Sequence, residues 1–374
     1  MNTLQFFKNK KVLITGHTGF KGMWLSIWLH SLGARVFGYS LPDISSNFLY
    51  TSLKNKTNRL HESICTFEDE YFADIREQER LKSFVCSVSP DMIFHLAAQP
   101  LVINSYQNPH LTWTTNVVGT LNLLSSLAEF EKLCSVCIVT TDKVYKNKNW
   151  SFGYRENDEL GGHDPYSASK AACELLSHSW DSSFLRSRSS SANKIGLGTA
   201  RSGNVIGGGD WSANRLVPDI FRAIQNNDEI RLRNPKSTRP WQHVLEPLYG
   251  YLLMNKHIYV SLEQNTYTSS GSFVYNFGPS VVSNKSVHEL TTSILRKFGD
   301  KRVTVESINY HEADKLNLQA DKAYHELGWT QLWNFDQTIE RTALWYKEFE
   351  NKHCPLELCL DDIKLYEDLL LLGQ

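Results

Sequence analysis

A tyrosine and a lysine four residues apart, Tyr166 and Lys170, form the pair of side chains with the clearest chemical potential in this chain. Residues four apart on a helix lie on the same face, so the phenol and the ammonium can act together. A nearby ammonium favours the phenolate, and we therefore expect the pKa of Tyr166 to lie below its reference value of about 10. Such a phenol could act as a general base near neutral pH.

A second reactive group follows the apolar run from Val136 to Val139, where the chain reads Thr140, Thr141, Asp142 and Lys143. The run predicts a strand over 136–140, and the polar residues come directly at its end. Asp142 offers a carboxylic acid. An ammonium such as Lys143, with a reference pKa of about 10.4, is a base at pH 7 only if burial or nearby cations lower that value. Otherwise its charge could stabilise an enolate.

Three glycines with the spacing Gly-x-x-Gly-x-x-Gly lie between a predicted strand over 12–15 and a predicted helix over 22–32. In this position glycines permit a tight turn and the close approach of a pyrophosphate to the helix N-terminus. A glycine triplet alone is weak evidence for a dinucleotide site, but the strand and the helix that must flank it are also predicted here. The predicted cofactor contacts in this segment are Gly16, Thr18, Gly19, Phe20, Lys21 and Gly22.

The elements that must position these residues alternate along the first half of the chain. Short β-branched runs at 12–15, 35–40, 92–96, 136–140 and 197–201 are separated by longer helical patterns. This alternation predicts an α/β fold with a doubly wound parallel sheet. We expect residues 1–203 to form mainly the dinucleotide-binding domain. Residues 204–374 should form mainly a smaller mixed α/β substrate-binding lobe, with some segments returning to the first domain.

Two other segments carry predictions about structure alone. The serine-rich stretch 182–191 has no apolar period and predicts a solvated loop. The last stretch, 356–372, has a helical pattern of leucines and acids and should pack on the body or on a second subunit. Cys134 and Cys137 have the spacing of half a metal site, but residues three apart on a strand point to opposite faces. We interpret both as core thiols and expect no metal site.

Three features follow one another along the chain: the glycine turn, the segment with Thr141 and the Tyr166–Lys170 pair. Their types and their order resemble those of the extended short-chain dehydrogenase/reductase family. The resemblance implies a Rossmann-type fold, a bound dinucleotide and a nucleotide-linked sugar as substrate. Thr141 would share a hydrogen bond with the substrate hydroxyl and Tyr166. Asn116 resembles the helix asparagine that braces the active-site backbone in the family.

The choice of dinucleotide depends on the end of the second strand. In NAD enzymes an acid there accepts from the adenosine ribose, whereas this chain offers Ser40, with Asp43 only after Pro42. Arg35 lies at the wrong end to hold a 2'-phosphate, so NAD is favoured over NADP by default. Asp74 resembles the family residue that accepts from the adenine amino group, although a solvated loop residue is nearly as frequent. The further predicted cofactor contacts are Ile75, Ala97, Ala98, Gln99, Asn116, Thr140, Tyr166 and Lys170.

The residue after Asp142 suggests a branch of the family. In sugar-nucleotide 4,6-dehydratases the active-site threonine is followed by Asp and Glu, whereas this chain has Lys143 in the last position. That departure resembles the branch acting on CDP-glucose, whose motif reads Thr-Asp-Lys. The stretches 153–158, 161–166, 201–211 and 239–244 agree with this branch, and the resemblance extends from about residue 10 to 345.

This resemblance implies a hydro-lyase that converts CDP-D-glucose to CDP-4-keto-6-deoxy-D-glucose, for deoxysugar and O-antigen-type polysaccharide biosynthesis. Hydride would pass internally from C4 to C6 through NAD. Tyr166 would remove the 4-hydroxyl proton, and Asp142 would protonate the departing 6-hydroxyl, while Lys143 acts as base or enolate stabiliser. The residues expected to bind the substrate are Gln99, Asn204, Arg215, Leu216, Val217, Arg239 and His243.

Composition and charge limit the other possibilities. The net charge of -1 and the absence of a long Lys/Arg run argue against a nucleic-acid partner. The sequence has no signal-peptide pattern and no run of about 20 apolar residues, so we expect a cytoplasmic protein without a membrane partner. Seven cysteines suit reduced thiols in such a compartment.

The sequence leaves two alternative functions open and also carries an expectation about assembly. A sugar-nucleotide 4-epimerase or 4-reductase would share Tyr166 and Lys170 without needing an acid at Asp142. A regulatory dinucleotide-sensing protein would use the fold without catalysis, although such a protein usually lacks an intact Tyr/Lys pair. The family expectation for assembly is a homodimer, or a higher homo-oligomer, built through two long helices that include the one carrying Tyr166.

Overall fold

One parallel sheet lies at the centre of the computed structural model, whose described residues are 3–42, 47–56, 67–186, 194–299, 301–305 and 315–372. Its seven strands run in the order β11-β6-β5-β4-β1-β2-β3. Their bounds are β1 Lys11–Thr15, β2 Arg35–Ser40, β3 Asp69–Phe72, β4 Met92–His95, β5 Cys134–Val139, β6 Ile195–Ser202 and β11 Val274–Phe277. The chain reverses its direction of winding between β1 and β4, and ligands of doubly wound sheets bind at such a switch point.

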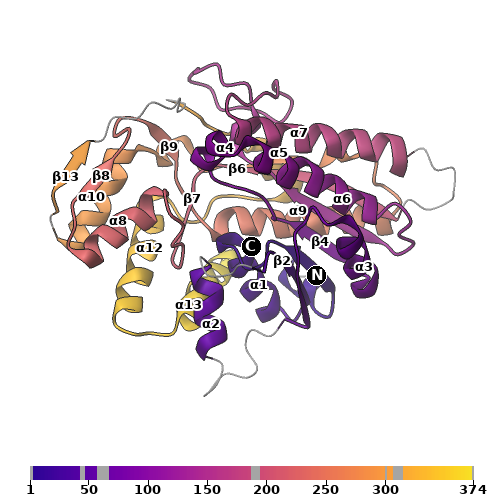
Figure 1. The fold of residues 1–374 in the computed structure, drawn as a ribbon, viewed down its shortest axis with the longest axis horizontal. Helices are drawn as coiled ribbons and strands as arrows, with labels where there is room; N and C mark the ends of the chain where they lie inside the picture. The colour runs from indigo at the N-terminus through magenta and orange to yellow at the C-terminus, as the bar shows by residue number, and fades with distance from the viewer. Residues whose placement is uncertain are drawn as a thin grey trace.

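Helices cover both faces of this sheet (Figure 1). Side chains alternate between the faces of a strand. Thus Val12 packs with α1 (Phe20–Ser31) and α9 (Leu245–Glu263), whereas Leu13 belongs to the cluster on the opposite face. The helices on that opposite face are α3 (Gln78–Val88), α6 (Gly119–Ser126) and α7 (Pro165–Trp180).

Short helical pieces connect these layers. They are η1 Leu4–Phe7, α2 Phe48–Lys56, α4 Val102–Gln107, α5 Pro109–Trp113, η2 Thr114–Val118, η3 Asp142–Val144 and η4 Asp181–Leu185. Two of them, η2 and η4, are single π-helical turns that continue longer helices.

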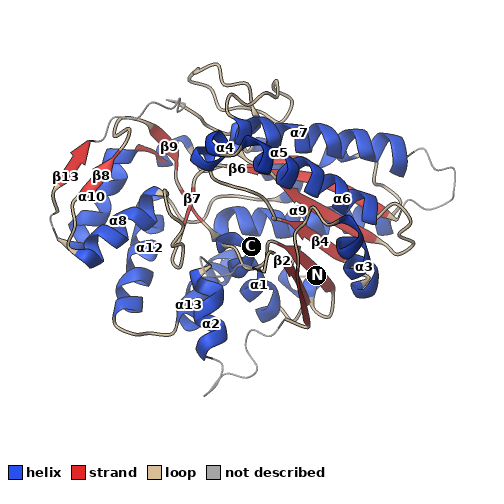
Figure 2. Ribbon diagram, viewed as in Figure 1, coloured by secondary structure: helices blue, strands red, loops and turns tan. Residues whose placement is uncertain are grey.

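A smaller group of elements lies beside the sheet, at the left of Figure 2. It combines the parallel pair β13–β8, the antiparallel pair β12–β9 and the helices α8, α10 and α12. The bounds are β7 Val205–Ile206, α8 Leu216–Asn226, β8 Ile230–Leu232, β9 Thr238–Pro240, β10 Gln242–His243, η5 Ser270–Phe273, η6 Val281–Ser283, β12 Asn284–Ser286, α10 Val287–Phe298, β13 Val303–Val305, α11 Asp321–Leu327, α12 Phe335–Glu350 and α13 Pro355–Leu372.

The observed elements agree with the expected strands to within two residues, and the α/β class is confirmed. The predicted helix over 22–32 begins earlier, at Phe20, because Gly19 is its N-cap in extended conformation. The helix at the end of the chain packs against α1, α2 and α12, and so on the body of the molecule. Cys134 and Cys137 are buried in the clusters on opposite faces of the sheet, as predicted.

The expectation of a loop over 182–191 is wrong for its first part. Residues 181–185 form η4, which continues α7, while 187–191 lie outside the described residues. Asp181 explains the difference, because its buried carboxylate accepts hydrogen bonds from the Ser270 amide at 2.7 Å and the Tyr267 hydroxyl at 3.3 Å. The rings of Trp180 and Phe184, tilted against each other with centroids 4.4 Å apart, complete the turn.

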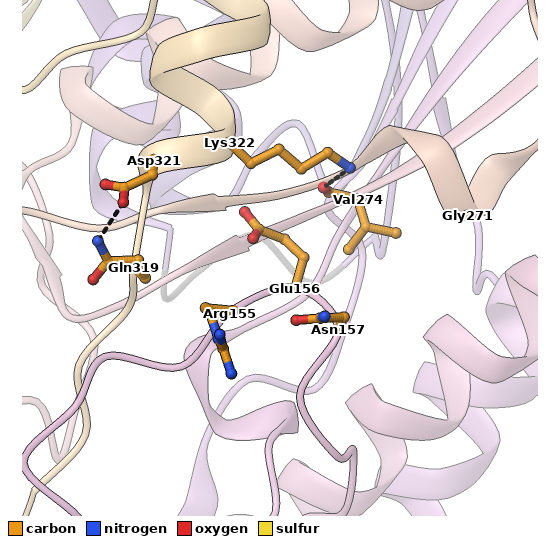
Figure 3. A pocket seen from close by; sticks show the side chains of 8 residues that line it. All are labelled: Arg155, Glu156, Asn157, Gly271, Val274, Gln319, Asp321 and Lys322. Atoms are coloured by element: carbon orange, nitrogen blue, oxygen red, sulfur yellow. Dashed lines mark hydrogen bonds between the residues drawn. The ribbon is translucent and has the colours of Figure 1, made fainter.

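The edge strand β11 is closed by charged side chains that line a cavity of about 420 Å³ (Figure 3). Lys322 donates to the carbonyl of Val274 at 3.0 Å, and Glu156 accepts from the amide of Asn276 at 2.8 Å. An open edge offers unpaired backbone groups to other chains. We interpret these residues as hydrogen-bond partners for the backbone groups of that edge.

Among the described helices, none has the length and apolar character needed to cross a membrane.

Candidate active site

The three glycines of the first turn have separate geometric roles. Gly16 has φ +74°, and a Cβ there would lie 2.8 Å from the amide nitrogen of Ala97. A Cβ on Gly22 would lie 2.2 Å from the carbonyl of Gly16, so this glycine lets α1 pack against the turn. At Gly19 a Cβ would meet only the carbonyl of Gly16, at 3.4 Å, and the helix N-terminus is otherwise open on that side. This cradle fits a pyrophosphate.

Two further predicted contacts, Phe20 and Lys21, open α1. Phe20 packs partly buried against the core. The ammonium of Lys21 donates to the Ser202 hydroxyl at 2.9 Å and to the Tyr251 hydroxyl at 3.1 Å. Burial, followed by the charges of Arg215 and Lys170, lowers the pKa of Lys21 to about 7. The sequence identified Lys21 only as a neighbour of the pyrophosphate, whereas the fold places it among the other cations of the site.

Helix α7 presents Tyr166 and Lys170 where strand β5 ends. Asp164 caps the helix by accepting from the Ser167 amide, and Pro165 occupies its first turn, so the chain enters the helix with Tyr166 in a fixed place. Lys170 is buried, and its ammonium donates to the carbonyl of Val139 at 3.0 Å. Burial lowers the pKa of Lys170.

The expected lowering of the Tyr166 pKa by Lys170 is wrong in this structure. Burial raises the pKa of the phenol to about 12, because the phenolate loses water. The groups that act in the opposite direction are Thr141, through a hydrogen bond, and the cation Arg215. The ammonium of Lys170 is directed to the backbone of β5 instead. A phenol with this pKa needs added positive charge before it can lose a proton near neutral pH.

The segment after β5 forms the short helix η3, which carries Asp142 and Lys143. The Thr141 hydroxyl donates to Asp142 Oδ1 at 2.9 Å, and the Lys143 ammonium donates to the same oxygen at 3.0 Å. The other carboxylate oxygen, Oδ2, is buried and has no hydrogen-bond partner among the described residues. It faces Gly203, where a Cβ would lie 3.4 Å away, next to Pro240. A buried acceptor without a partner is costly, so this oxygen is available to a ligand group.

Asn116 connects the backbone of Gln99 to helix α7. It lies in the π turn η2, and its side chain accepts from the Gln99 amide at 2.8 Å and donates to the Ser169 hydroxyl on α7 at 2.8 Å. The side-chain amide of Gln99 is itself engaged by Leu101 and Thr112. His95 is a core residue between two threonine hydroxyls, and burial lowers its pKa to about 3.

Polar side chains gather at the end of β2. Thr18 and Ser40 share a hydrogen bond of 2.8 Å, and Asn47 donates to Thr18 at 2.8 Å. Arg35, at the other end of the strand, is paired with Glu68 on the surface. Asp43 lies outside the described residues. The remaining predicted cofactor contacts have local partners: Asp74 binds Arg76, Ile75 packs on Gly119, Ala97 and Ala98 follow β4, and Thr140 donates to Glu174.

Most of the residues expected to bind substrate come from elements beyond β6. Asn204 follows β6, and its Oδ1 is buried without a partner among the described residues. Arg215 is the N-cap of α8, whose first turn holds Leu216 and Val217, and its guanidinium donates to Asp210 at 3.0 Å. Arg239 lies on β9, buried, and donates to the Thr238 carbonyl.

His243 does not join this group, and its prediction as a substrate residue is corrected. Its imidazole is fully buried between the rings of Trp24 and Trp333, 5.7 and 4.7 Å away. Its Nε2 lies 3.9 Å from Asp362 on α13. Burial lowers the pKa of His243 to about 3, so the ring is a neutral part of the core.

The sequence interpretation missed a buried ion pair next to the site. Glu174 on α7 and Arg201 on β6 are both buried, and the guanidinium Nε donates to the carboxylate at 2.8 Å. Glu174 lies four residues after Lys170 and eight after Tyr166, so helical spacing could have identified it.

Known proteins of similar sequence and fold include sugar-nucleotide dehydratases and epimerases. The family model described as GDP-mannose 4,6 dehydratase matches residues 13–342. The CDP-glucose 4,6-dehydratase of Salmonella typhimurium is 41% identical over 346 residues, which are 91% of this chain and 92% of that protein. The CDP-paratose 2-epimerase of Salmonella typhi is 30% identical over 181 residues, 44% of this chain and 51% of that protein.

The dTDP-glucose 4,6-dehydratase DesIV of Streptomyces venezuelae, solved with NAD and TYD bound, has the same fold. Its TM-score is 0.74 at 22% identity, with 92% of this chain and 99% of that chain covered. The chain described here therefore belongs to the GDP-mannose 4,6-dehydratase family.

Proposed function

We propose that this protein is an NAD-dependent hydro-lyase that converts CDP-D-glucose to CDP-4-keto-6-deoxy-D-glucose. The observation that carries the proposal is the buried carboxylate of Asp142, whose Oδ1 is held by Thr141 and Lys143 while Oδ2 has no partner among the described residues. An epimerase needs no acid at this place. The name of the Salmonella typhimurium relative, 41% identical over nearly the whole chain, supports the same reaction.

The first step is the loss of the 4-hydroxyl proton to Tyr166, which shares a hydrogen bond with Thr141. NAD, when bound, supplies the acceptor that takes the C4 hydride and later returns it to C6. Arg215 already lowers the pKa of the phenol, and the buried ammonium of Lys170 lies one helical turn from it. Of these two cations, Arg215 is the one that favours the phenolate that the step requires.

The second step is the loss of water across C5 and C6, which the new ketone makes feasible by acidifying the C5 hydrogen. Asp142 protonates the departing 6-hydroxyl through its unpartnered oxygen. The Lys143 ammonium donates to the other carboxylate oxygen at 3.0 Å. Lys143 acts as the C5 base in its neutral form or stabilises the enolate as the cation. C5 regains a proton when the hydride returns to C6, so the sugar loses one water overall. One hydrogen-bonded pair thus serves both ends of the elimination.

The remaining predicted residues hold the ligands in this proposal. The glycine turn with Thr18, Phe20 and Lys21 binds the NAD pyrophosphate, and Ser40, Asp74 and Ile75 line the adenosine end. Residues Ala97, Ala98, Gln99, Asn116 and Thr140 form or support the wall at the nicotinamide. The cation of Arg215, the amides of Leu216 and Val217 at the start of α8, and Arg239 bind the sugar diphosphate, with Asn204 beside it.

We further propose that two copies associate through α5, η2 and α7. These elements pack together and expose the large apolar side chains of Trp113, Val118 and Leu175, and Phe184 is exposed on η4, which continues α7; the four are 41 to 61% exposed. Apolar side chains grouped on adjacent helices suit a second copy of the same surface. Light scattering measures the assembly, and a monomer mass would reject it.

The product would feed deoxysugar synthesis of the O-antigen polysaccharide type, in the cytoplasm. Its 4-keto group makes it a substrate for reductases and transaminases. Recovery of the protein from a membrane or secreted fraction of the cell would contradict this placement.

The decisive experiment is incubation of the protein and NAD with CDP-glucose, followed by mass spectrometry of the sugar nucleotide. Loss of one water and the alkaline absorbance of a 4-keto sugar are the expected results. A product of unchanged mass would instead show an epimerase. No conversion of any of several nucleotide sugars, with NAD still bound, would favour a dinucleotide-sensing protein.

A further inference from the structure

The segment that carries the acid and the lysine is anchored at both of its ends to one buried ion pair. At its start, the Thr140 hydroxyl donates to Glu174 at 2.6 Å. At its end, the Tyr145 hydroxyl accepts from Arg201 Nη1 at 2.6 Å. Glu174 and Arg201 are bound to each other through two guanidinium nitrogens. Thr141, Asp142 and Lys143 lie between the two anchored residues.

The ion pair connects three elements of the fold. Glu174 belongs to α7, one turn beyond Lys170, and Arg201 belongs to β6. The Tyr145 hydroxyl also donates to Asn276 Oδ1 at 2.7 Å, on strand β11. A charged pair with most of its hydrogen-bonding capacity satisfied is a rigid anchor in a low-dielectric interior. Its position ties the helix of Tyr166 to the segment of Asp142.

We propose that Arg201 and Glu174 are positioning residues, which set the place of Asp142 and Lys143 relative to Tyr166 and Lys170 through Tyr145 and Thr140. This inference rests on the proposed function, because the step it controls is the elimination of water. The base for the 4-hydroxyl, Tyr166, lies on α7, and only its hydrogen-bond partner Thr141 lies on the anchored segment. Both groups for elimination, Asp142 and Lys143, lie on that segment. Loosening that segment therefore slows elimination more than oxidation at C4.

Substitution of Arg201 or Glu174 is a poor test, because either change leaves an unpaired charge in the core and endangers folding. Tyr145→Phe is more selective. It removes one hydroxyl, while Arg201 keeps Glu174 and the carbonyl of Glu156, 3.0 Å from Nη1. Tyr154→Phe is the matched control, since its ring stacks on Tyr145 at 4.9 Å but its hydroxyl binds Lys148 and Asn147.

The experiment compares the wild type and the two variants with CDP-glucose and NAD. For Tyr145→Phe we expect kcat to fall about tenfold or more, because small displacements of catalytic groups have effects of this size. KM should stay within about twofold, since the proposed diphosphate contacts lie on other elements. In a single turnover, the absorbance of reduced nicotinamide should build up, because oxidation then outruns elimination. Tyr154→Phe should resemble the wild type in all three measurements.

Two outcomes separate the possible failures. If the wild type forms no dehydrated product, the proposed function itself is wrong. If the wild type does form it and the two variants lose activity equally, without build-up of reduced nicotinamide, the positioning role is rejected. Thermal denaturation of both variants shows whether a loss of activity comes from a loss of stability, because such a loss would lower the melting temperature.

Discussion

At the scale of single residues, the contact between Asp142 and Lys143 is the feature that the sequence could not show. The motif gives the order of the residues, whereas their side chains meet on one oxygen at 3.0 Å. Lys143 is 31% exposed and Asp142 is fully buried. The acid is thus closed off from water, while the lysine side chain is partly exposed. Any change at Lys143 also changes the hydrogen bonding of the acid.

Replacing Lys143 by Met should abolish exchange of the C5 hydrogen with solvent deuterium. Methionine keeps much of the length of the side chain but can neither accept a proton nor stabilise an enolate. Dehydration should fall by at least about a hundredfold, the usual contribution of a general acid or base. Lys146→Met is the control, because this lysine lies on the same segment but pairs with Glu159 on the surface. Full exchange in Lys143→Met would remove the lysine from the chemistry.

At the scale of elements, periodicity was a reliable guide to the sheet and a poor guide to the orientation of single side chains. The strands are short apolar runs with turn residues between them, and they form where the pattern predicts. His243 lies in a motif typical of a substrate site, but Trp24 and Trp333, distant in sequence, bury its ring. The prediction of a lowered Tyr166 pKa was wrong for a similar reason. Spacing along a helix does not show how far burial removes water from the phenol.

The second domain was predicted from residue 204 onward, and the position of that boundary remains a proposal. The structure shows β11 and α9, from beyond this point, on the central sheet. The antiparallel pair β9–β12 carries Arg239 opposite Lys285. Because short strands joined by loops give little periodic signal, the sequence could indicate the motif around Arg239 but not its pairing.

Arg239→Ala should raise the KM for the nucleotide sugar about tenfold or more with a smaller effect on kcat. The reason is that the diphosphate is bound equally in the ground state and in the transition state. Removing the Arg239 guanidinium therefore weakens the binding of both by the same amount. Steady-state kinetics over a range of CDP-glucose concentrations checks this. Arg231→Ala, on the preceding strand β8, is the control, because Arg231 is largely exposed and paired with Glu229. An unchanged KM in Arg239→Ala would reject the assignment.

At the scale of the whole molecule, the last helices are attached to the core by a buried acid. Glu246 on α9 accepts from the amide of Trp333 at 2.7 Å and from the hydroxyl of Tyr366 on α13 at 2.9 Å. Burial raises the pKa of Glu246 to about 7, although these hydrogen bonds lower it. The folded protein therefore binds this proton over a range of pH in which the unfolded chain has lost it.

This linkage predicts how the stability of the protein depends on pH. The stabilisation from protonated Glu246 is fully present below about pH 4.5 and is lost as the pH rises through about 7, a change of roughly 3 kcal/mol. Asp362, with its pKa raised to about 6 by burial, acts in the same direction, whereas His95 and His243, lowered to about 3, act oppositely. The wild-type profile alone therefore cannot isolate Glu246.

Glu246→Gln isolates this group, because the amide mimics the neutral acid and all other titrating residues remain. Urea unfolding at several pH values should give equal free energies of unfolding for the two proteins near pH 4.5. Above pH 7 the variant should be the more stable by roughly 3 kcal/mol. Glu263→Gln, at the exposed end of the same helix, should follow the wild type. A constant difference between Glu246→Gln and the wild type at every pH would show that Glu246 does not bind its proton more tightly in the folded protein, and that the attachment of α13 does not depend on its protonation.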